Sequence, residues 1–414
     1  MKYMHNKQSL RSLRNLIVLI FILFPVFLSA QERLVSNSQI PIIGWFSVTP
    51  GEETTVARYQ EMKDAGFSIS FSFLRNYQDI EQALNTADKV GMKIVITCPE
   101  MLTETEKTVK KFMNHPALAG YFVRDEPGAK DFAELAAVVK KINAVDAKHF
   151  CYINLFPNYA SPAQLGTDDY RQYVVKFINE VPLHFYSFDF YPLTDIPGIY
   201  TNWHKNLEIF SDEARKAGKP FWAFAQSTQY DNRHEETSLA TLRVQFYTDL
   251  AYGAQGLQYF TYWTPPANAN ESFYDGPVGL DGKRTSVYDK VKLINQEMKN
   301  LSGVFLGSKV ISVVQSGKNI PAGTVRMSQP PFPLKILETC GDGAVVSVLE
   351  NGENRFIVIV NRDYIKSMKL TLLGDESLKK VLKDGTIVPA SLYANTIEVE
   401  PGDAAIYLYP KPDK

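Results

Sequence analysis

One pattern, repeated along most of the chain, restricts the possible fold more than any other feature. From Ile42 onward, an apolar run with strand character is followed by an amphipathic helical stretch. The pair recurs at intervals of roughly 25–36 residues, which is the length of one βα unit. Eight apolar runs fit the pattern, at residues 42–48, 67–73, 92–97, 118–124, 150–156, 185–190, 220–225 and 256–262. Strands that are apolar throughout are buried on both faces, so the pattern predicts a parallel sheet covered by helices.

Helical stretches occupy the gaps between these runs, for example at residues 55–65, 79–90, 132–142, 202–217 and 238–252. Several are followed directly by a glycine, which is typical of a helix C-terminus. Eight βα units over about 260 residues predict a (β/α)8 barrel. The alternative is a doubly wound open sheet, which usually has a glycine-rich phosphate turn after its first strand. The segment SVTPGE at residues 47–52 has no such turn, which favours the barrel.

The C-terminal part of the chain has a different pattern of apolar and polar residues. After a final helical stretch at residues 286–301, apolar and polar residues alternate with a period of two at 344–349 and 356–360. The Asn351-Gly352 pair between them is a strong hairpin signal. We therefore expect a barrel at residues 31–303 and a small antiparallel β-sandwich at 304–414.

The first thirty residues resemble a secretory signal peptide. Four basic residues and no acidic one precede an apolar run at 16–28, and the small residues Ser29 and Ala30 follow it. An uncleaved membrane anchor is the alternative, but the run is shorter than the roughly 20 residues that span a bilayer, and Pro25 interrupts it. We expect cleavage near Ala30, export to the periplasm or the extracellular space, and no membrane association afterwards.

Composition excludes several classes of function. The chain has 44 basic and 45 acidic residues, so it lacks the basic excess of a nucleic-acid-binding protein. Its three cysteines, Cys98, Cys151 and Cys340, are far apart and odd in number, which argues against a disulfide framework. The six histidines do not have the spacing of metal ligands. We therefore expect no cofactor and no metal.

In a (β/α)8 barrel the active site lies at the carboxyl ends of the strands. Carboxylates, amides and aromatic rings gather at those positions, and such a set suits a sugar, which has apolar ring faces and many hydroxyls. Cleaving a glycosidic bond requires an acid for the leaving oxygen and a second group that stabilises the oxocarbenium ion. We therefore expect an oligo- or polysaccharide substrate. The candidate catalytic residues are Glu126, as general acid/base, with Asp125 and Asp189; the candidate sugar-binding residues are Trp45, Arg75, Asn154, Tyr191, Gln226 and Trp263.

The segment LAGYFVRDEP at residues 118–127 resembles the acid/base strand of the (β/α)8 glycoside hydrolases. In the branch that contains the family 42 β-galactosidases and the family 5 cellulases, the corresponding motif is usually Asn-Glu, often followed by Pro. Trp263 at the eighth strand end, Arg75 at the second and the C-terminal β-domain are further shared features. The resemblance is to the superfamily rather than to one family, and it implies a glycosidase in which Glu126 is the acid/base.

One departure from that branch affects the expected mechanism. Those enzymes carry a nucleophilic Glu at the end of the seventh strand, where this chain has Gln226, and an amide cannot attack an anomeric carbon. The Asp125-Glu126 pair also resembles the β-hexosaminidases of families 20 and 123, in which the 2-acetamido group of the substrate is the nucleophile. Alternatively, Asp189 acts as nucleophile or activates water, depending on its distance from Glu126. A third alternative is a glycan-binding protein without activity.

Structural roles are also open for all three of these acids. Asp125, Glu126 and Pro127 have the chemistry of a helix N-terminus, where acids complement the helix dipole and proline fits the first turn. Asp189 could form an ion pair with Arg75 or Arg124 in the mouth of the barrel.

Overall fold

The computed structural model describes residues 33–34, 36, 38–193, 202–230, 236–269 and 271–412. The expected signal peptide at residues 1–30 lies outside the described residues. Within the described ranges, no helix is both long enough and apolar enough to cross a membrane.

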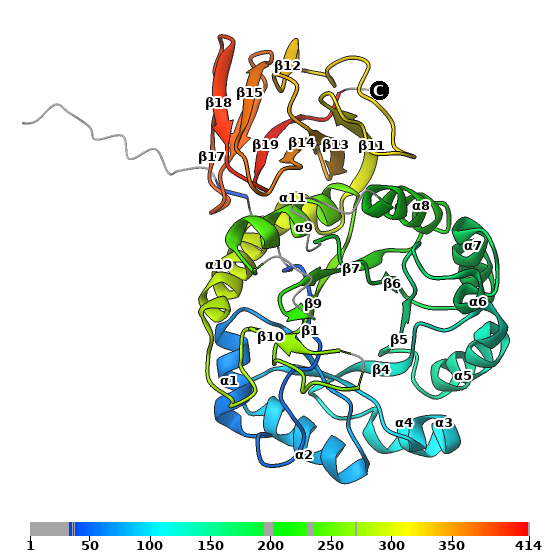
Figure 1. Cartoon of the computed structure of the whole chain (residues 1–414). Coiled ribbons are helices and arrows are strands. Elements are labelled where there is room, and N and C mark those ends of the chain that lie inside the picture. The colour runs from blue at the N-terminus through cyan, green and yellow to red at the C-terminus, as the bar shows by residue number, and fades with distance from the viewer. Residues whose placement is uncertain are drawn as a thin grey trace, which may run out of the picture. The chain divides into compact units, whose positions relative to one another are not determined.

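Eight parallel strands form a closed barrel, in chain order, with the last strand paired to the first (Figure 1). They are β1 (Ile42–Gly44), β2 (Ile69–Phe71), β3 (Lys93–Ile96), β4 (Leu118–Asp125), β5 (Phe150–Leu155), β6 (Tyr186–Phe188), β7 (Phe221–Gln226) and β9 (Gly256–Phe260). The predicted barrel is confirmed. Several strands are shorter than predicted because apolar residues continue into the loops; Trp45 and Val48 follow β1 and are still buried.

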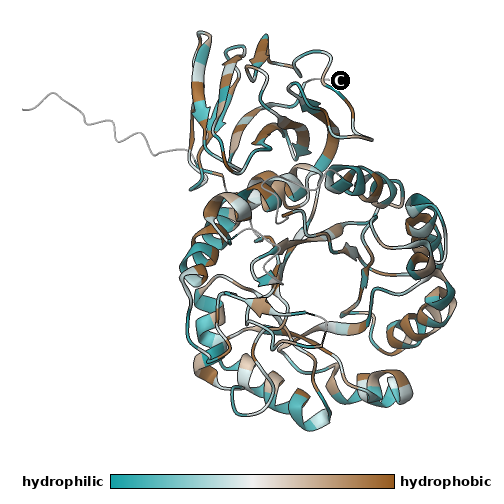
Figure 2. Ribbon diagram, viewed as in Figure 1, coloured by the Kyte–Doolittle hydropathy of each residue, from teal (hydrophilic) through white to brown (hydrophobic). Residues whose placement is uncertain are grey.

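Helices surround the barrel (Figure 1). They are α1 (Val56–Asp64), α2 (Tyr77–Asp88), α3 (Glu100–Thr103), α4 (Thr105–Phe112), α5 (Phe132–Val145), α6 (Pro162–Leu165), α7 (Tyr170–Glu180), α8 (Asn202–Lys216), α9 (Leu239–Ala251), α10 (Ser286–Asn300) and α11 (Ser302–Phe305). Side-chain caps begin many of them; Thr55 accepts a hydrogen bond at the start of α1, and Asn76 does so at the start of α2. Along the ribbon, hydrophilic and hydrophobic residues alternate on the helices (Figure 2).

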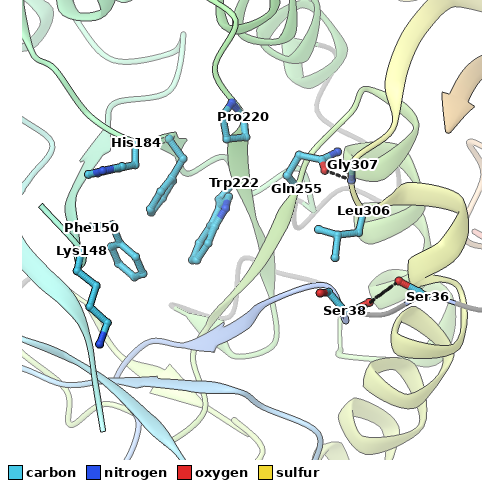
Figure 3. Close-up of a pocket in the computed structure, with 11 residues that line it drawn as sticks. Ser36, Ser38, Lys148, Phe150, His184, Pro220, Trp222, Gln255, Leu306 and Gly307 are labelled. Carbon is cyan, nitrogen blue, oxygen red and sulfur yellow. Dashed lines mark hydrogen bonds between the residues drawn. The ribbon is translucent and has the colours of Figure 1, made fainter. Parts of the chain in front are cut away.

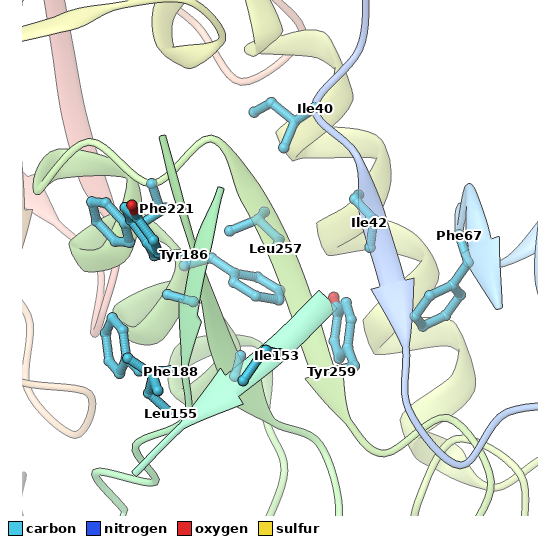
Figure 4. Close-up of a cluster of buried hydrophobic side chains, with 14 of the residues drawn as sticks. Ile40, Ile42, Phe67, Ile153, Leu155, Tyr186, Phe188, Phe221, Leu257 and Tyr259 are labelled. Carbon is cyan, nitrogen blue, oxygen red and sulfur yellow. The ribbon is translucent and has the colours of Figure 1, made fainter. Parts of the chain in front are cut away.

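Strand alternation divides the buried residues of the barrel into two layers. Ile153, Leu155 and Leu257 face outward and pack with residues of the surrounding helices (Figure 4). Trp45 and Tyr152 face inward and belong to a separate, largely aromatic cluster inside the barrel. Side chains therefore fill the barrel interior, and a substrate can enter only at its ends.

The C-terminal region forms two antiparallel sheets, with strand orders β11-β13-β14-β19-β16-β17 and β12-β15-β18. The strands are β11 (Lys309–Ser316), β12 (Ile336–Glu338), β13 (Ala344–Asn351), β14 (Asn354–Asn361), β15 (Met368–Leu373), β16 (Lys379–Val381), β17 (Ile387–Pro389), β18 (Asn395–Val399) and β19 (Ala404–Pro410). Ile357 of one sheet and Leu370 of the other share a buried cluster. The predicted sandwich and its hairpin at Gly352, where φ is +60°, are both confirmed.

The sandwich packs against the barrel through α9 and the residues after it. Ser347 Oγ donates a hydrogen bond to the Ala251 carbonyl at 2.7 Å, and Gln315 Nε2 donates to Tyr252 Oη at 3.0 Å. The expected boundary at residues 303/304 falls within α11, and β11 begins at Lys309.

Two short strands, β8 (Gln229–Tyr230) and β10 (Phe273–Tyr274), pair antiparallel. They join the loop after β7 to the loop after β9, at the carboxyl end of the barrel. This pairing gives part of the long segment 264–285 a defined place beside the site described next.

Candidate active site

A cavity of about 560 Å³ is lined by residues at or just after the carboxyl ends of the barrel strands. Its volume falls in the range of small-molecule sites. Four acidic residues line it, Asp125, Glu126, Asp189 and Glu271, and nine of the lining residues are aromatic: Trp45, Phe46, Phe73, Phe156, Tyr159, Tyr191, Phe224, Phe260 and Phe273. The combination of carboxyl groups and aromatic walls is the one expected for a sugar site.

A second cavity, of about 670 Å³, lies at the opposite end of the barrel, where the strands begin. Figure 3 shows Phe150, Trp222 and Lys148 around it. None of the described residues that line it is acidic. It therefore offers no carboxyl group for the cleavage of a glycosidic bond, and we place the candidate site at the carboxyl end.

The backbone at the end of β4 turns sharply at Glu126. Its φ angle is +42°, a left-handed value that is uncommon for a residue with a side chain. The Glu126 N–H donates to the Asn154 carbonyl of β5 at 2.8 Å, which holds this turn in place. Strained backbone of this kind concentrates at functional sites.

The alternative that these residues begin a helix is wrong. A single 3-10 turn starts only at Ala129, and α5 follows at Phe132. Neither Asp125 nor Glu126 is a cap of those elements. The acids at the end of β4 face the cavity instead.

Glu126 and Asp189 both line this cavity, and each influences the ionisation of the other. Burial, and next the negative charge of Asp125, raise the pKa of Glu126 to about 7. Burial, followed by the charges of Glu126 and Asp125, also raises the pKa of Asp189 well above its usual value. Asp189 Oδ1 is shielded from solvent and has no hydrogen-bond partner among the described residues. Two carboxyl groups so placed resist ionisation, because burial and their mutual repulsion both oppose the negative charge.

Asp125 has a different environment. Its side chain is accessible from the cavity, but protein surrounds it on most sides, and this desolvation raises its pKa to about 6. A hydrogen bond donated by Asn154 Nδ2 to Asp125 Oδ1 at 3.2 Å opposes that rise. Asp125 is therefore the carboxyl group of the three that ionises first as the pH increases.

Three of the expected sugar-binding residues, Trp45, Asn154 and Tyr191, line the cavity. Trp45 is almost fully buried at 3% exposure, so only its edge is available to a ligand. The amide of Asn154 donates to Asp125 and accepts from Ser187 Oγ at 2.8 Å, so its principal partners are protein groups.

The other three, Arg75, Gln226 and Trp263, are not among the lining residues. Arg75 is exposed and pairs with Asp79, one helical turn ahead, at 2.6 Å. Gln226 is buried and donates from Nε2 to the Thr228 carbonyl at 3.2 Å. The guanidinium of Arg58 lies 5.0 Å from the centre of the Trp263 ring.

Because Arg75 pairs with Asp79, it is not the ion-pair partner that was considered for Asp189. At the end of β7, the residue that reaches the cavity is Phe224, so this strand contributes no carboxyl group to it.

Sequence reasoning missed Glu271. It lies in the loop between β9 and α10, is exposed, and lines the cavity. Its N–H donates to Asn268 Oδ1 at 2.9 Å, and its carboxylate accepts from Asn268 Nδ2 at 3.3 Å. Its negative charge contributes to the raised pKa of Glu126. No periodicity marks a loop residue of this kind, and only the fold of segment 264–285 brings it to the cavity.

Comparison with known families gives one match. The model of the family 42 β-galactosidases matches residues 166–301, a segment that includes Asp189 and Gln226 but not Glu126. A comparison with curated protein sequences gives no match.

Solved structures extend the similarity over the whole fold. A catalytic mutant of a family 42 β-galactosidase from G. stearothermophilus has a TM-score of 0.60 at 8% identity, covering 92% of this chain and 100% of that one. A family 5 glycoside hydrolase from Bacteroides vulgatus has a TM-score of 0.57 at 11% identity, covering 92% and 93%. A β-galactosidase from the psychrophilic Marinomonas ef1 has a TM-score of 0.48 at 12% identity; 63% of this chain spans 60% of that protein. The expected resemblance to (β/α)8 glycoside hydrolases, without a single family, is confirmed.

Proposed function

We propose that this chain is an exported glycoside hydrolase that cleaves O-glycosidic bonds of an oligo- or polysaccharide, with Glu126 as general acid/base. The observation that carries the proposal is Glu126 itself, held in a left-handed turn over the cavity with a pKa raised to about 7. An acid whose pKa lies near the working pH can both deliver and recover a proton. Export to the periplasm or the extracellular space rests on the basic and apolar character of residues 1–30.

In the proposed reaction, protonated Glu126 gives its proton to the glycosidic oxygen as the bond to the anomeric carbon breaks. Positive charge then develops on the sugar ring, and ionised Asp125 stabilises it or orients a 2-acetamido group that does so. Water then adds to the anomeric carbon and gives a proton to the carboxylate of Glu126, which restores the starting state. Burial keeps Asp189 protonated, so it adds no negative charge beside Glu126. The aromatic walls pack against the apolar faces of the sugar.

Hydrolysis of a panel of aryl glycosides, each with and without a 2-acetamido group, tests the proposal. Release of the aryl group only from 2-acetamido sugars supports the role of Asp125 in orienting that group. Release from plain sugars assigns the second role to a protein carboxylate, which is ionised Asp125 in this reaction; Asp189 would take that role only if it were ionised as well. No release from any of the sugars, with glycan binding retained, would contradict hydrolysis.

A second candidate function is glycan binding without catalysis. The observation that favours it is the end of β7, where Gln226 is buried and Phe224 reaches the cavity. Calorimetric titration with oligosaccharides that are recovered intact afterwards would support binding alone.

The pH dependence of kcat/KM should be bell-shaped with a narrow maximum between about pH 6 and pH 7. Below about 6, Asp125 gains a proton and loses the charge that stabilises the transition state. Above about 7, Glu126 loses the proton that it must donate. Initial rates at low substrate concentration measure this profile, because kcat/KM reports the groups of the free enzyme. A profile that is flat from about pH 5 to pH 9 would contradict both assignments.

Glu271→Gln should move the alkaline limb of the same profile to lower pH by a few tenths of a unit. The substitution removes a negative charge that opposes ionisation of Glu126, so Glu126 ionises more easily. High salt should reduce the difference, because Glu271 is exposed. The matched control is Glu398→Gln, an exposed acid on β18 of the sandwich, which should leave the profile unchanged. Equal shifts in both variants would contradict a local effect.

A further inference from the structure

A continuous chain of hydrogen bonds crosses the interior of the barrel and ends on Asp125. Trp45 Nε1 donates to Tyr152 Oη at 2.9 Å, and the Tyr152 hydroxyl donates to Gln258 Oε1. Gln258 Nε2 donates to Ser187 Oγ at 2.8 Å, and Ser187 Oγ donates to Asn154 Oδ1 at 2.8 Å. The last link is the hydrogen bond from Asn154 Nδ2 to Asp125 Oδ1.

The residues of this chain come from four places in the barrel wall. Tyr152 and Asn154 lie on β5, Ser187 on β6 and Gln258 on β9, and Trp45 follows β1. All are at most 3% exposed, so water cannot replace their partners. An unpaired polar group in such a place is costly, and each of these side chains therefore depends on its neighbours in the chain.

The two ends give the chain a direction. The indole N–H of Trp45 can only donate, and an ionised carboxylate can only accept. Each of the four residues between them accepts from the Trp45 side and donates toward Asp125. Because Ser187 donates to the oxygen of the Asn154 amide, the amide must turn its N–H toward Asp125. A hydrogen bond donated to Asp125 Oδ1 is strongest when the carboxyl group is ionised, so the last link favours the charged form.

The surroundings of this polar chain are largely aromatic. Phe71, Phe122 and Phe224 lie within 5.4 Å of the Trp45 ring, measured between ring centres, so the interior is otherwise aromatic. A fully hydrogen-bonded polar network in such a core fixes the orientation of its members.

We propose that Tyr152, Gln258 and Ser187 are positioning residues that act through Asn154 to hold Asp125 ionised, while Glu126 and Asp189 stay protonated. This proposal rests on the proposed function, since it assigns the charged and the protonated carboxyl groups of that reaction. None of the three positioning residues is among those that line the cavity.

Other titratable groups also face Asp125 and influence its titration. They are the carboxyl groups of Glu126 and Asp189 and the phenols of Tyr152, Tyr173 and Tyr191. Burial keeps all three phenols neutral in the working range of pH, and the variants below leave both carboxyl groups in place.

The test is a titration of Asp125 by carbon NMR, with 13C in the aspartate carboxyl groups and Asp125→Asn to identify its signal. Ser187→Ala breaks the chain next to Asn154 and should raise the pKa of Asp125 by about 0.5–1 unit. Tyr152→Phe breaks it further away and should shift the pKa in the same direction by less. Ser187→Thr keeps the hydroxyl and should restore the value. In kcat/KM, the acidic limb should move to higher pH in parallel.

The matched control is Tyr259→Phe. Tyr259 is also fully buried and lies beside Gln258 on β9, but its hydroxyl donates outward to Asn295 Oδ1 at 2.7 Å. A purely structural role would give Tyr152→Phe and Tyr259→Phe the same loss of thermal stability and no change in the titration, which would overturn the proposal. The NMR titration needs no substrate. A shifted pKa in a protein without hydrolase activity would therefore support the chain and contradict only the proposed function.

Discussion

Glu126→Gln is expected to lower kcat for an alkyl or sugar leaving group by about 10²–10⁴-fold, with little change in KM. Glutamine has the shape of glutamate, so the aromatic walls and Asp125 should still bind the sugar. It cannot donate a carboxyl proton, so the departing oxygen must leave as an alkoxide. Steady-state kinetics on a natural disaccharide and on aryl glycosides of increasing leaving-group acidity measure the effect.

The dependence on leaving group distinguishes a lost acid from a damaged site. A strongly acidic phenol leaves without help, so the loss in the bond-breaking step should shrink as the leaving group becomes more acidic. A misfolded or misaligned site would lose activity equally on all substrates. A loss below about tenfold on the least activated substrate would contradict the role of Glu126.

The free energy of unfolding of Glu126→Gln shows whether the variant still folds. The pKa of Glu126 is raised in the folded protein, so its contribution to stability is present at low pH and is lost as the pH rises through about 7. Glu126→Gln removes this loss, and the variant should be more stable than the parent at pH 8, by on the order of 1–3 kcal/mol. Below about pH 4 the two should match, because the carboxyl is then protonated in both the folded and the unfolded state.

The sequence was informative about the barrel because parallel strands buried on both faces have a distinctive texture. Runs such as residues 150–156 and 256–262 contain few polar residues, and helices with caps and terminal glycines separate them. The residues at which the strands end were harder to predict. After β1, Trp45 and Val48 are as buried as the strand itself, so hydrophobicity alone could not mark where hydrogen bonding stops.

Side-chain direction at the strand ends was the main limit in predicting the site. The position of Glu126 and Asp189 at the ends of strands predicted that they would lie at the same site, and both line one cavity. Strand position could not show that Arg75 would turn to Asp79 on its own helix, or that Gln245 of α9 would accept from the Gln226 N–H at 2.8 Å beneath the cavity wall. These orientations depend on neighbours distant in sequence.

The polar chain inside the barrel did leave a signal in the sequence. Gln258 and Ser187 are polar residues in the middle of strands that were expected to be buried. Buried polar side chains are hydrogen-bonded, so two of them at inward-facing positions indicate partners across the barrel. Their order and direction, from Trp45 to Asp125, could be read only from the structure.

Arg243→Ala is expected to lower the free energy of unfolding by about 3–5 kcal/mol. Arg243 of α9 is only 11% exposed; it lies 3.1 Å from Glu297 of α10 and 3.2 Å from Glu400 of the sandwich, measured between nitrogen and oxygen. Its removal leaves the carboxylate of Glu297, which is 5% exposed, with Lys383 at 4.0 Å as the remaining cation. A buried charge that loses its partner is strongly destabilising.

Urea unfolding followed by tryptophan fluorescence measures this effect, because all four tryptophans lie in the barrel segment. The control is Arg215→Ala, an exposed arginine of α8 that pairs with Asp212 at 3.0 Å; it should cost less than about 1 kcal/mol. Adding Glu297→Gln to Arg243→Ala should recover part of the loss, since it removes the unpaired charge. Equal small losses in both arginine variants would mean that Glu297 remains solvated. A large loss that Glu297→Gln partly reverses would show that the cost of Arg243→Ala comes from the buried carboxylate of Glu297, so that the charge pair between α9 and α10 contributes to the stability of the barrel.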